Sequence, residues 1–414
     1  MVVPLTRSPY QQNPIAELGA IGDWFVNAAT GNDSYDGQSA TNVGGTTHGP
    51  WASIEKANAV ISPNGARLRL QQATTVHVAT GAYGGLKLYP DQTSSGFPFL
   101  VDCATTSAGP WTLATVVNTN PAGPTRGRIT AAGATFTNRR KLRCVTGSHP
   151  GAVTYINGVT SATDCFVQHW YDPSTDSTVD LAPGDTIVQD TIGVSFNAMF
   201  CQKLGPDPGA GSCYTLKNAN VARGASLPGI FGGGLTNTIT RGPLLQECEI
   251  GAAIWNGVFS FIGCRAPTGF SLCNGVIAMA GCAMQNGSVF VFEKSLLRPR
   301  LGCGVDAAQI HLTGDSSLWF SSAHDCEFEN GGALLTAIEI DPMCRMLADV
   351  GQQLWGVTGT YGTGVNVHSG ATICYDQTPT IPSTVNSLLA GVNTPFGSWP
   401  VADTAHAAFI AKTV

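Results

Sequence analysis

Short strand-like segments recur at a nearly constant spacing through residues 242–370. Cys248, Cys264 and Cys282 each lie in or beside one of them, at steps of 264 − 248 = 16 and 282 − 264 = 18 residues. Cys326 follows after 326 − 282 = 44 residues, which two longer turns or three shorter ones fill. Such a period is typical of a parallel β-solenoid, in which like residues form columns along the axis. A small side chain such as Cys suits an inward-facing column.

The composition agrees with strands and tight turns rather than helices or disorder. Of 414 residues, 50 are Gly and 24 are Pro, while charged residues make up 12% and hydrophobic residues 43%. We therefore predict an all-β fold, a right-handed parallel β-helix with a short N-terminal capping helix and inserted loops or a small β subdomain. A β-sandwich or barrel remains the alternative.

The most specific stretch begins at Trp24. A strand over residues 24–27 leads into a turn rich in Asn, Asp and Gly over residues 28–37. After a Gly-Pro-Trp sequence, residues 54–61 place apolar side chains on one helical face, with Ser53 as N-cap. Residues 75–83 then form a strand and a turn.

This order of strand, Asx-Gly loop, Gly-Pro-aromatic, short helix and strand resembles the N-terminal start of the pectin-lyase-like right-handed parallel β-helix families, which include phage tailspike-type proteins. In those families the short helix caps the open end of the solenoid. A cap is required because the first coil otherwise exposes an apolar cross-section and an unpaired strand edge. The resemblance spans residues 23–83 and implies a homotrimer.

Changes in pattern along the chain predict five parts. These are an extended N-terminal arm (1–22), the start and cap of the β-helix (23–83), a β-rich insertion or early coils (84–190), the main β-helix (191–375) and a C-terminal closing segment (376–414).

Charge and cysteine usage exclude several classes of protein. The net charge of −6 and the pI of about 5.7 give no basic stripe for nucleic acid. The one dense basic cluster, residues 139–143, is interpreted as a solvated loop or a subunit contact. No apolar run is long enough to insert into a membrane, and the N-terminus lacks a signal peptide. With 13 Cys and no CxxC pair, we expect synthesis in a host cytoplasm with free thiols.

The resemblance also suggests where catalysis would lie. Hydrolases of these families use two or three carboxylates on neighbouring coils, and the candidates here are Asp306, Asp315, Asp325 and Glu327. Asp325 and Glu327 alternate with apolar residues, so both could face outward from one strand. The ordered hydrolase motifs and the clustered Asp set of the lyases are missing, however, and outward acids are expected on any solenoid. No catalytic residue is therefore assigned.

Two further sets of residues are candidates for binding. Trp319, Trp355 and Tyr361 could stack on a sugar, although such aromatics are more often core or interface residues. Oxygen ligands in the first turn could hold Ca²⁺, although Asx-rich turns usually satisfy their own backbone; they come from Asn32, Asp33 and Asp36.

Three functions from different classes follow. The first is a structural component of a phage or virus particle (a spike, fibre or decoration protein), oligomeric, exposed on the virion exterior and contacting other virion proteins through residues 1–22. The second is a polysaccharide depolymerase of the tailspike kind, a hydrolase or lyase. The third is a non-enzymatic β-helix that binds a host-surface glycan.

Overall fold

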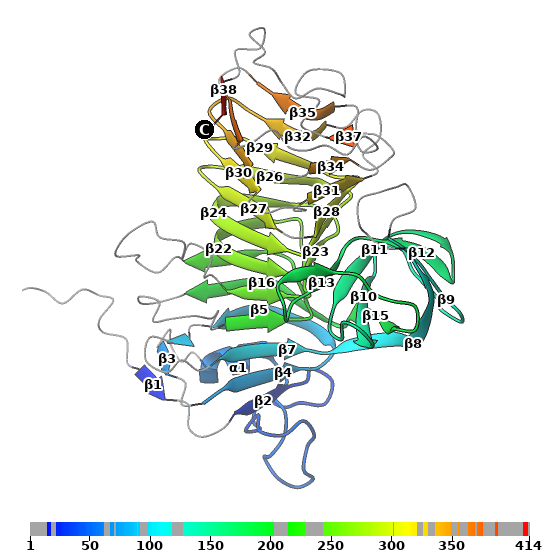
Figure 1. Ribbon diagram of the computed structural model, residues 1–414. Helices are drawn as coiled ribbons and strands as arrows, with labels where there is room; N and C mark the ends of the chain where they lie inside the picture. The colour runs from blue at the N-terminus through cyan, green and yellow to red at the C-terminus, as the bar shows by residue number, and fades with distance from the viewer. Residues whose placement is uncertain are drawn as a thin grey trace, which may run out of the picture.

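A computed structural model describes most of the chain as a ladder of stacked coils with a lobe on one side (Figure 1). The residues that it describes are 15–17, 22–61, 67–69, 72–88, 90–91, 98–117, 127–202, 214–227, 243–300, 302–320, 326–329, 336–348, 354–356, 363–368, 371–375, 386–387 and 409–412.

The coils form three stacks of strands, and the chain passes through stacks 1, 2 and 3 in turn. Neighbouring coils pair in parallel within each stack, except where β37 joins β34 in antiparallel fashion. Stack 1 contains β2 (Asp23–Val26), β4 (Thr74–Val78), β7 (Phe99–Cys103), β17 (Tyr214–Lys217), β20 (Leu244–Gln246), the second halves of β22 (Ile254–Ile262) and β24 (Phe270–Ala280), β27 (Leu296–Arg300), β30 (Ser317–Phe320), β33 (Arg345–Ala348), β36 (Thr372–Tyr375) and β38 (Phe409–Lys412).

The other two stacks share their first strands, because β5 (Gly81–Leu88) and β16 (Val194–Gln202) each run through both. Stack 2 continues with β18 (Ala219–Val221), β21 (Glu249–Ile250), β23 (Arg265–Ala266), β25 (Ala283–Gln285), β28 (Cys303–Asp306), β31 (Cys326–Glu329), β34 (Leu354–Gly356) and β37 (Asn386–Ser387). Stack 3 continues with β19 (Gly224–Leu227), the first halves of β22 and β24, β26 (Ser288–Phe292), β29 (Gln309–Leu312), β32 (Thr336–Ile340) and β35 (Thr363–Val367). The predicted parallel β-helix is confirmed.

The predicted cysteine column lies inside the coils. Cys248, Cys264, Cys282 and Cys303 are fully buried where the chain enters stack 2. The thiol of Cys264 donates to the carbonyl of Leu245 in the preceding coil (3.2 Å), and the thiols of Cys248 and Cys282 make equivalent bonds. All cysteines with described side chains are free thiols.

Helix α1 (Ile54–Ile61) lies below β5 and beside β4 and β7 in Figure 1, with the bounds that the sequence predicts. Ile54 and Ala57 are buried in the main core, and the Ser53 hydroxyl accepts from Lys56 N (3.1 Å) as the N-cap. The Asn58 side chain donates to the carbonyl of Gly85 (2.8 Å) and accepts from the amide of Lys87 (2.9 Å), both in β5. These bonds cover the edge of β5 that is not paired with any described strand.

The side lobe is an inserted antiparallel domain of residues 105–192. It leaves the β-helix after β7 and rejoins it at β16, where Gly193 N donates to the carbonyl of Ala104 (3.2 Å). It has a hydrophobic core separate from that of the coils. Its strands are β8 (Thr105–Val116), β9 (Arg128–Ala131), β10 (Lys141–Thr146), β11 (Val153–Ser161), β12 (Asp164–Val167), β13 (Trp170–Asp172), β14 (Ser177–Val179) and β15 (Thr186–Ile192).

The two ends of the chain are described only in part. Within the predicted arm, β1 (Ile15–Glu17) pairs in parallel with β3 (Arg67–Arg69), which pairs with β6 (Pro90–Asp91). Within residues 376–414 the structure describes β37 and β38 alone. Among the described residues, no helix has the length and apolar character needed to cross a membrane.

Candidate ligand-binding cleft

The inserted domain packs against the corner where the chain turns from stack 1 into stack 2. In successive coils, Gly263, Gly281 and Gly302 adopt positive φ at this corner. A Cβ on Gly281 would lie 2.5 Å from the Cβ and Cγ of Tyr171 in the inserted domain. Glycine therefore meets two demands here, a left-handed backbone and close approach of a second domain.

Polar contacts fix the domain along the same corner. The hydroxyl of Tyr155 donates to the carbonyl of Gly263 (2.5 Å). Further along the axis, Nη2 of Arg300 donates to both carboxylate oxygens of Asp176, at 2.8 Å each. These contacts, together with the glycine corner, hold the lobe in one position against the coils.

One coil before Gly263, the charged residue Glu247 takes the place of the glycine at this corner. Glu247 has positive φ and is buried, and its Oε2 lies 2.6 Å from Nζ of Lys141 in the inserted domain. The same Nζ lies 3.4 Å from Oδ2 of Asp190, which also accepts from Nε of Arg143 (2.8 Å). Nζ of Lys217 lies 3.5 Å from the other oxygen of Glu247. A chain of ion pairs thus joins the lobe to the coils.

Both buried carboxylates are ionised at neutral pH. Burial on its own raises the pKa of Asp190, but the hydrogen bond from Arg143 and the charge of Lys141 outweigh it and leave the pKa below its usual value. Burial likewise raises the pKa of Glu247, and the charges of Lys141 and Lys217 bring it below the usual value. Neither group is a proton donor near pH 7.

Beside this network lies a cleft of about 600 Å³ between the lobe and the outer surface of stack 1. The coils contribute Asp102, Lys217, Asn218, Leu244, Gln246, Glu247 and Ile262, and the inserted domain contributes Thr105, Arg143, Pro150, Gly151, Asp172, Pro173, Ser174 and Asp190.

The cleft is lined by polar and apolar surface in similar amounts. Asp102 and Lys217 are direct neighbours on adjacent coils, while Leu244 and Ile262 supply the apolar surface. On the opposite wall, the carboxylate of Asp172 accepts from the amide (2.8 Å) and hydroxyl (2.6 Å) of Ser174. Burial raises the pKa of Asp172, but these bonds hold it below the usual value. Fixed donors and acceptors around an open concavity can bind a ligand rich in hydroxyl groups.

Of the predicted catalytic candidates, the structure describes the side chains of Asp306 and Asp315 alone, and these lie in different parts of the coils. Asp306 lies at the end of β28 in stack 2 and is buried, so it does not face a groove. Asp315 lies in a turn before stack 1, where Oδ1 is 3.6 Å from Nη2 of Arg345. The backbone of Glu327 lies in β31, and Asp325 falls outside the described residues.

The predicted stacking residues are scattered as well. Trp319 in β30 is half-buried, and the guanidinium carbon of Arg298 lies 4.1 Å from its ring centroid, so a cation covers that face. The backbone of Trp355 lies in β34 beside that of Glu327. Tyr361 falls outside the described residues.

The side-chain oxygens of the first turn, which were candidates for binding Ca²⁺, accept hydrogen bonds from nearby residues of the same chain. Asn32 Oδ1 accepts from the amide and hydroxyl of Ser34, and Asp33 accepts from two amides and the hydroxyl that precede α1. Asp36 accepts from two amides and lies 2.8 Å from Nδ1 of His48. These bonds hold the loop closed and start the helix.

The residues that form the cleft were not predicted as a site. The basic cluster over residues 139–143 was interpreted as a solvated loop or a subunit contact, but Lys141 is buried and ion-paired, and Arg143 pairs with Asp190. Lys141 and Glu247 are 106 residues apart in the chain, so no local spacing connects them. The density of the basic cluster was the one available signal.

Comparisons with known proteins give similarity to solved structures alone. No protein-family model matches the chain, and no curated protein matches it. One similar structure is the Gp54 tailspike of Acinetobacter baumannii bacteriophage AP22 in complex with A. baumannii capsular saccharide, at 12% identity and a TM-score of 0.26 over 79% of this chain. This chain covers 65% of that tailspike, less than two thirds of its length.

Two others are the tailspike gp49 of Pseudomonas phage LKA1 and a GH136 lacto-N-biosidase from Eubacterium ramulus. The first is 10% identical with a TM-score of 0.21, over 77% of this chain and 69% of that one. The second is 10% identical with a TM-score of 0.23, over 95% of this chain and 68% of that one. The strand pairing by itself establishes the expected parallel β-helix fold, and these similarities are not needed for it.

Proposed function

We propose that the protein is a tailspike-like component of the exterior of a phage particle, and that it binds a glycan of the host surface in the cleft without cleaving it. The observation that carries this proposal is the cleft itself, a concavity of about 600 Å³ between two bodies joined by buried ion pairs. A stiff coil ladder with its first edge covered also suits a particle exterior.

The charge of the cleft favours a neutral glycan over an acidic one. Its lining includes the carboxylates of Asp102, Asp172, Asp190 and Glu247 against the cations of Arg143 and Lys217, with Lys141 behind Asp190 and Glu247, which leaves one negative charge in excess. An acidic polysaccharide would meet this excess of negative charge, whereas neutral hydroxyls can pair with acceptors and donors alike.

The ionisation of Asp172, Asp190 and Glu247 argues against these three groups as the acid of a hydrolase. A glycosidase needs one carboxyl group whose pKa is raised, so that it can protonate the leaving oxygen. In this cleft the pKa values of Asp172, Asp190 and Glu247 all lie below the usual value. These three groups are buried and paired with protein donors, and none of them supplies the proton.

The test is an array of neutral and acidic bacterial surface polysaccharides probed with the full chain. We expect neutral glycans to be retained with no new reducing ends. Asp102→Asn and Lys217→Gln each remove a fixed charged contact and should weaken binding about tenfold, as for one lost charge-assisted hydrogen bond. Asp23→Asn is the matched control, because Asp23 also lies on stack 1 but outside the cleft, with its side chain 63% exposed.

Three results would each reject part of this proposal. An array with no retained glycan would reject glycan binding. Equal binding by the wild type and both cleft variants would place the glycan elsewhere on the molecule. Release of reducing ends would replace a binding protein with a depolymerase.

We further propose that the chain assembles as a homotrimer and joins other virion proteins through residues 1–22. Support comes from the resemblance of residues 23–83 to tailspike-type proteins and from the symmetry usual in such assemblies. Sedimentation equilibrium at micromolar concentration should give a mass of 3 × 43.0 kDa, from the chain mass of 43.0 kDa. A monomer under those conditions would reject the trimer and leave the cleft proposal standing.

A further inference from the structure

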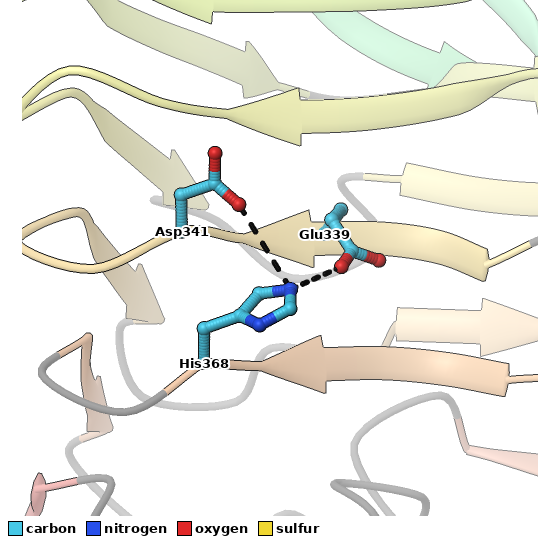
Figure 2. A group of neighbouring side chains, drawn as sticks. All are labelled: Glu339, Asp341 and His368. Atoms are coloured by element: carbon cyan, nitrogen blue, oxygen red, sulfur yellow. Dashed lines mark hydrogen bonds and ion pairs between the residues drawn. The ribbon is translucent and has the colours of Figure 1, made fainter.

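Near the C-terminal end of the coils, the outer surface of stack 3 carries a group of side chains that the proposed function does not use. Glu339 lies in β32, Asp341 directly after it, and His368 directly after β35 in the next coil (Figure 2). Their ligand atoms all lie within 4.8 Å of one another. Their side chains are 15%, 30% and 44% exposed, so the group is open on one side.

The three side chains converge on one point. Nε2 of His368 lies 2.5 Å from Oε1 of Glu339 and 3.9 Å from Oδ1 of Asp341. Four ligands at about 2.0 Å from a tetrahedral centre are about 3.3 Å apart, and the two observed distances bracket that value. Small side-chain rotations are enough to place one nitrogen and two oxygens around a metal ion.

The backbone fixes the two corner residues that supply ligands. The amide of Asp341 donates to the carbonyl of Leu312 (3.0 Å) in the coil before. The amide of His368 donates to the carbonyl of Ile340 (3.0 Å), which directly precedes Asp341. The ladder of the β-helix therefore sets the separation of the ligands, as a rigid scaffold does in a preorganised site.

Neighbouring polar side chains hold the carboxylates from behind. His311 is the residue paired with Glu339 on the preceding coil, and its Nε2 lies 3.2 Å from Oδ2 of Asp341. This nitrogen of His311 is buried, and its contact with Asp341 does not have the geometry of a hydrogen bond. Its described polar contact is therefore the ion pair with Asp341. On the next coil, Asn366 donates to Oε1 of Glu339 (2.7 Å). Such outer partners orient ligands in metal sites.

We propose that Glu339, Asp341 and His368 bind a divalent first-row transition metal of the Zn²⁺ or Mn²⁺ class. His311 orients Asp341, and water completes the coordination. An imidazole with two carboxylates suits these ions, whereas Ca²⁺ and Mg²⁺ prefer sites made of oxygen alone. The metal would join β32 to β35 and staple two successive coils. This site is independent of the glycan cleft.

The test is calorimetric titration of ZnCl₂ into the full chain after dialysis against EDTA. We expect one ion per chain, a rise in the thermal unfolding temperature with added metal, and no such rise with CaCl₂. His368→Gln and Asp341→Asn each remove one ligand at nearly constant volume and should weaken binding at least tenfold.

His77→Ala is the matched control. His77 also faces outward from a coil and lies 3.2 Å from the carboxylate of Asp23, but among the described residues it belongs to no group of three ligand atoms within 4.8 Å of one another. Zinc binding should be unchanged in this variant. The proposal is overturned if no zinc binds, or if both ligand variants bind as the wild type does, since the metal then sits elsewhere, for example on free thiols. A variant that fails to fold is replaced by His368→Asn, judged by the same titration.

Discussion

At the scale of single residues, the corner between stacks 1 and 2 decides how the inserted domain sits. Gly281 must adopt φ of +58° and must also leave room for the ring of Tyr171. In the first coils of the corner, Asn218 and Glu247 adopt the same backbone conformation but carry side chains. These side chains reach Lys141, so the corner changes from packing to ion pairing along the axis.

Replacing Gly281 with Ala should destabilise the protein by about 2–4 kcal/mol. The left-handed backbone accounts for about 1–2 kcal/mol, and displacement of Tyr171 for the rest. Gly133→Ala is the control, because Gly133 has φ of +73° but no atom within 4 Å of an added Cβ. Urea unfolding curves of both variants measure the difference. An equal loss in both would contradict tight docking at this corner.

The buried ion pairs predict a stability that falls in acid. Asp190 and Glu247 have lower pKa values in the folded chain than in the unfolded chain, where they are about 4. The folded state therefore binds fewer protons, and the stabilisation is full above about pH 4 and is lost as the pH falls through the lower, folded pKa values. Urea midpoints measured from pH 6 to pH 3 follow this loss.

Glu247→Gln isolates the contribution of the pair. Lys141 then keeps Asp190 at 3.4 Å but loses its 2.6 Å contact with the Glu247 carboxylate, which should cost about 1–3 kcal/mol at pH 7. The dependence of the urea midpoint on pH below 5 should also become shallower than in the wild type. Asp23→Asn, at an exposed site, should leave that dependence unchanged. Parallel curves for the wild type and Glu247→Gln would show that the pair does not control the acid response.

At the scale of elements, α1 protects the first unpaired strand edge. Asn58→Ala frees the carbonyl of Gly85 and the amide of Lys87, and should cost about 1–3 kcal/mol. The uncovered edge of β5 should also raise self-association on heating, measured by light scattering. Ser53→Ala removes the N-cap bond and the hydroxyl's bond to Asp33 but leaves the edge of β5 covered, and should cost about 1–2 kcal/mol without added association. Association in both variants, or in neither, would contradict this role of Asn58.

The elements differ in how far the sequence predicts them. The bounds of α1 and the inward cysteines follow from local patterns, namely an apolar helical face with an N-cap and a repeated small residue. The bounds of the inserted domain do not, because its antiparallel pairing joins β8 to β15 across many residues. Local periodicity carries no information about such pairs.

At the scale of the whole molecule, the pairing of coils brings distant residues into register. This explains why neither the cleft nor the group around Glu339 could be predicted from the sequence. His311, Glu339 and Asn366 stand side by side because successive coils pair there, although the lengths of those coils differ. The same holds for the cleft. Asp102 and Lys217 are neighbours on adjacent coils, although the whole inserted domain lies between them in the sequence. A site of this kind can be predicted only once the register is known.

The cleft between the inserted domain and stack 1 is the proposed place of glycan binding. The direct measurement is a crystal structure of the full chain soaked with the neutral oligosaccharide that the array retains best. We predict sugar density against Asp102, Lys217 and Ser174. Density on the outer surface of stack 3, or an empty cleft at a saturating concentration of the sugar, would contradict the account.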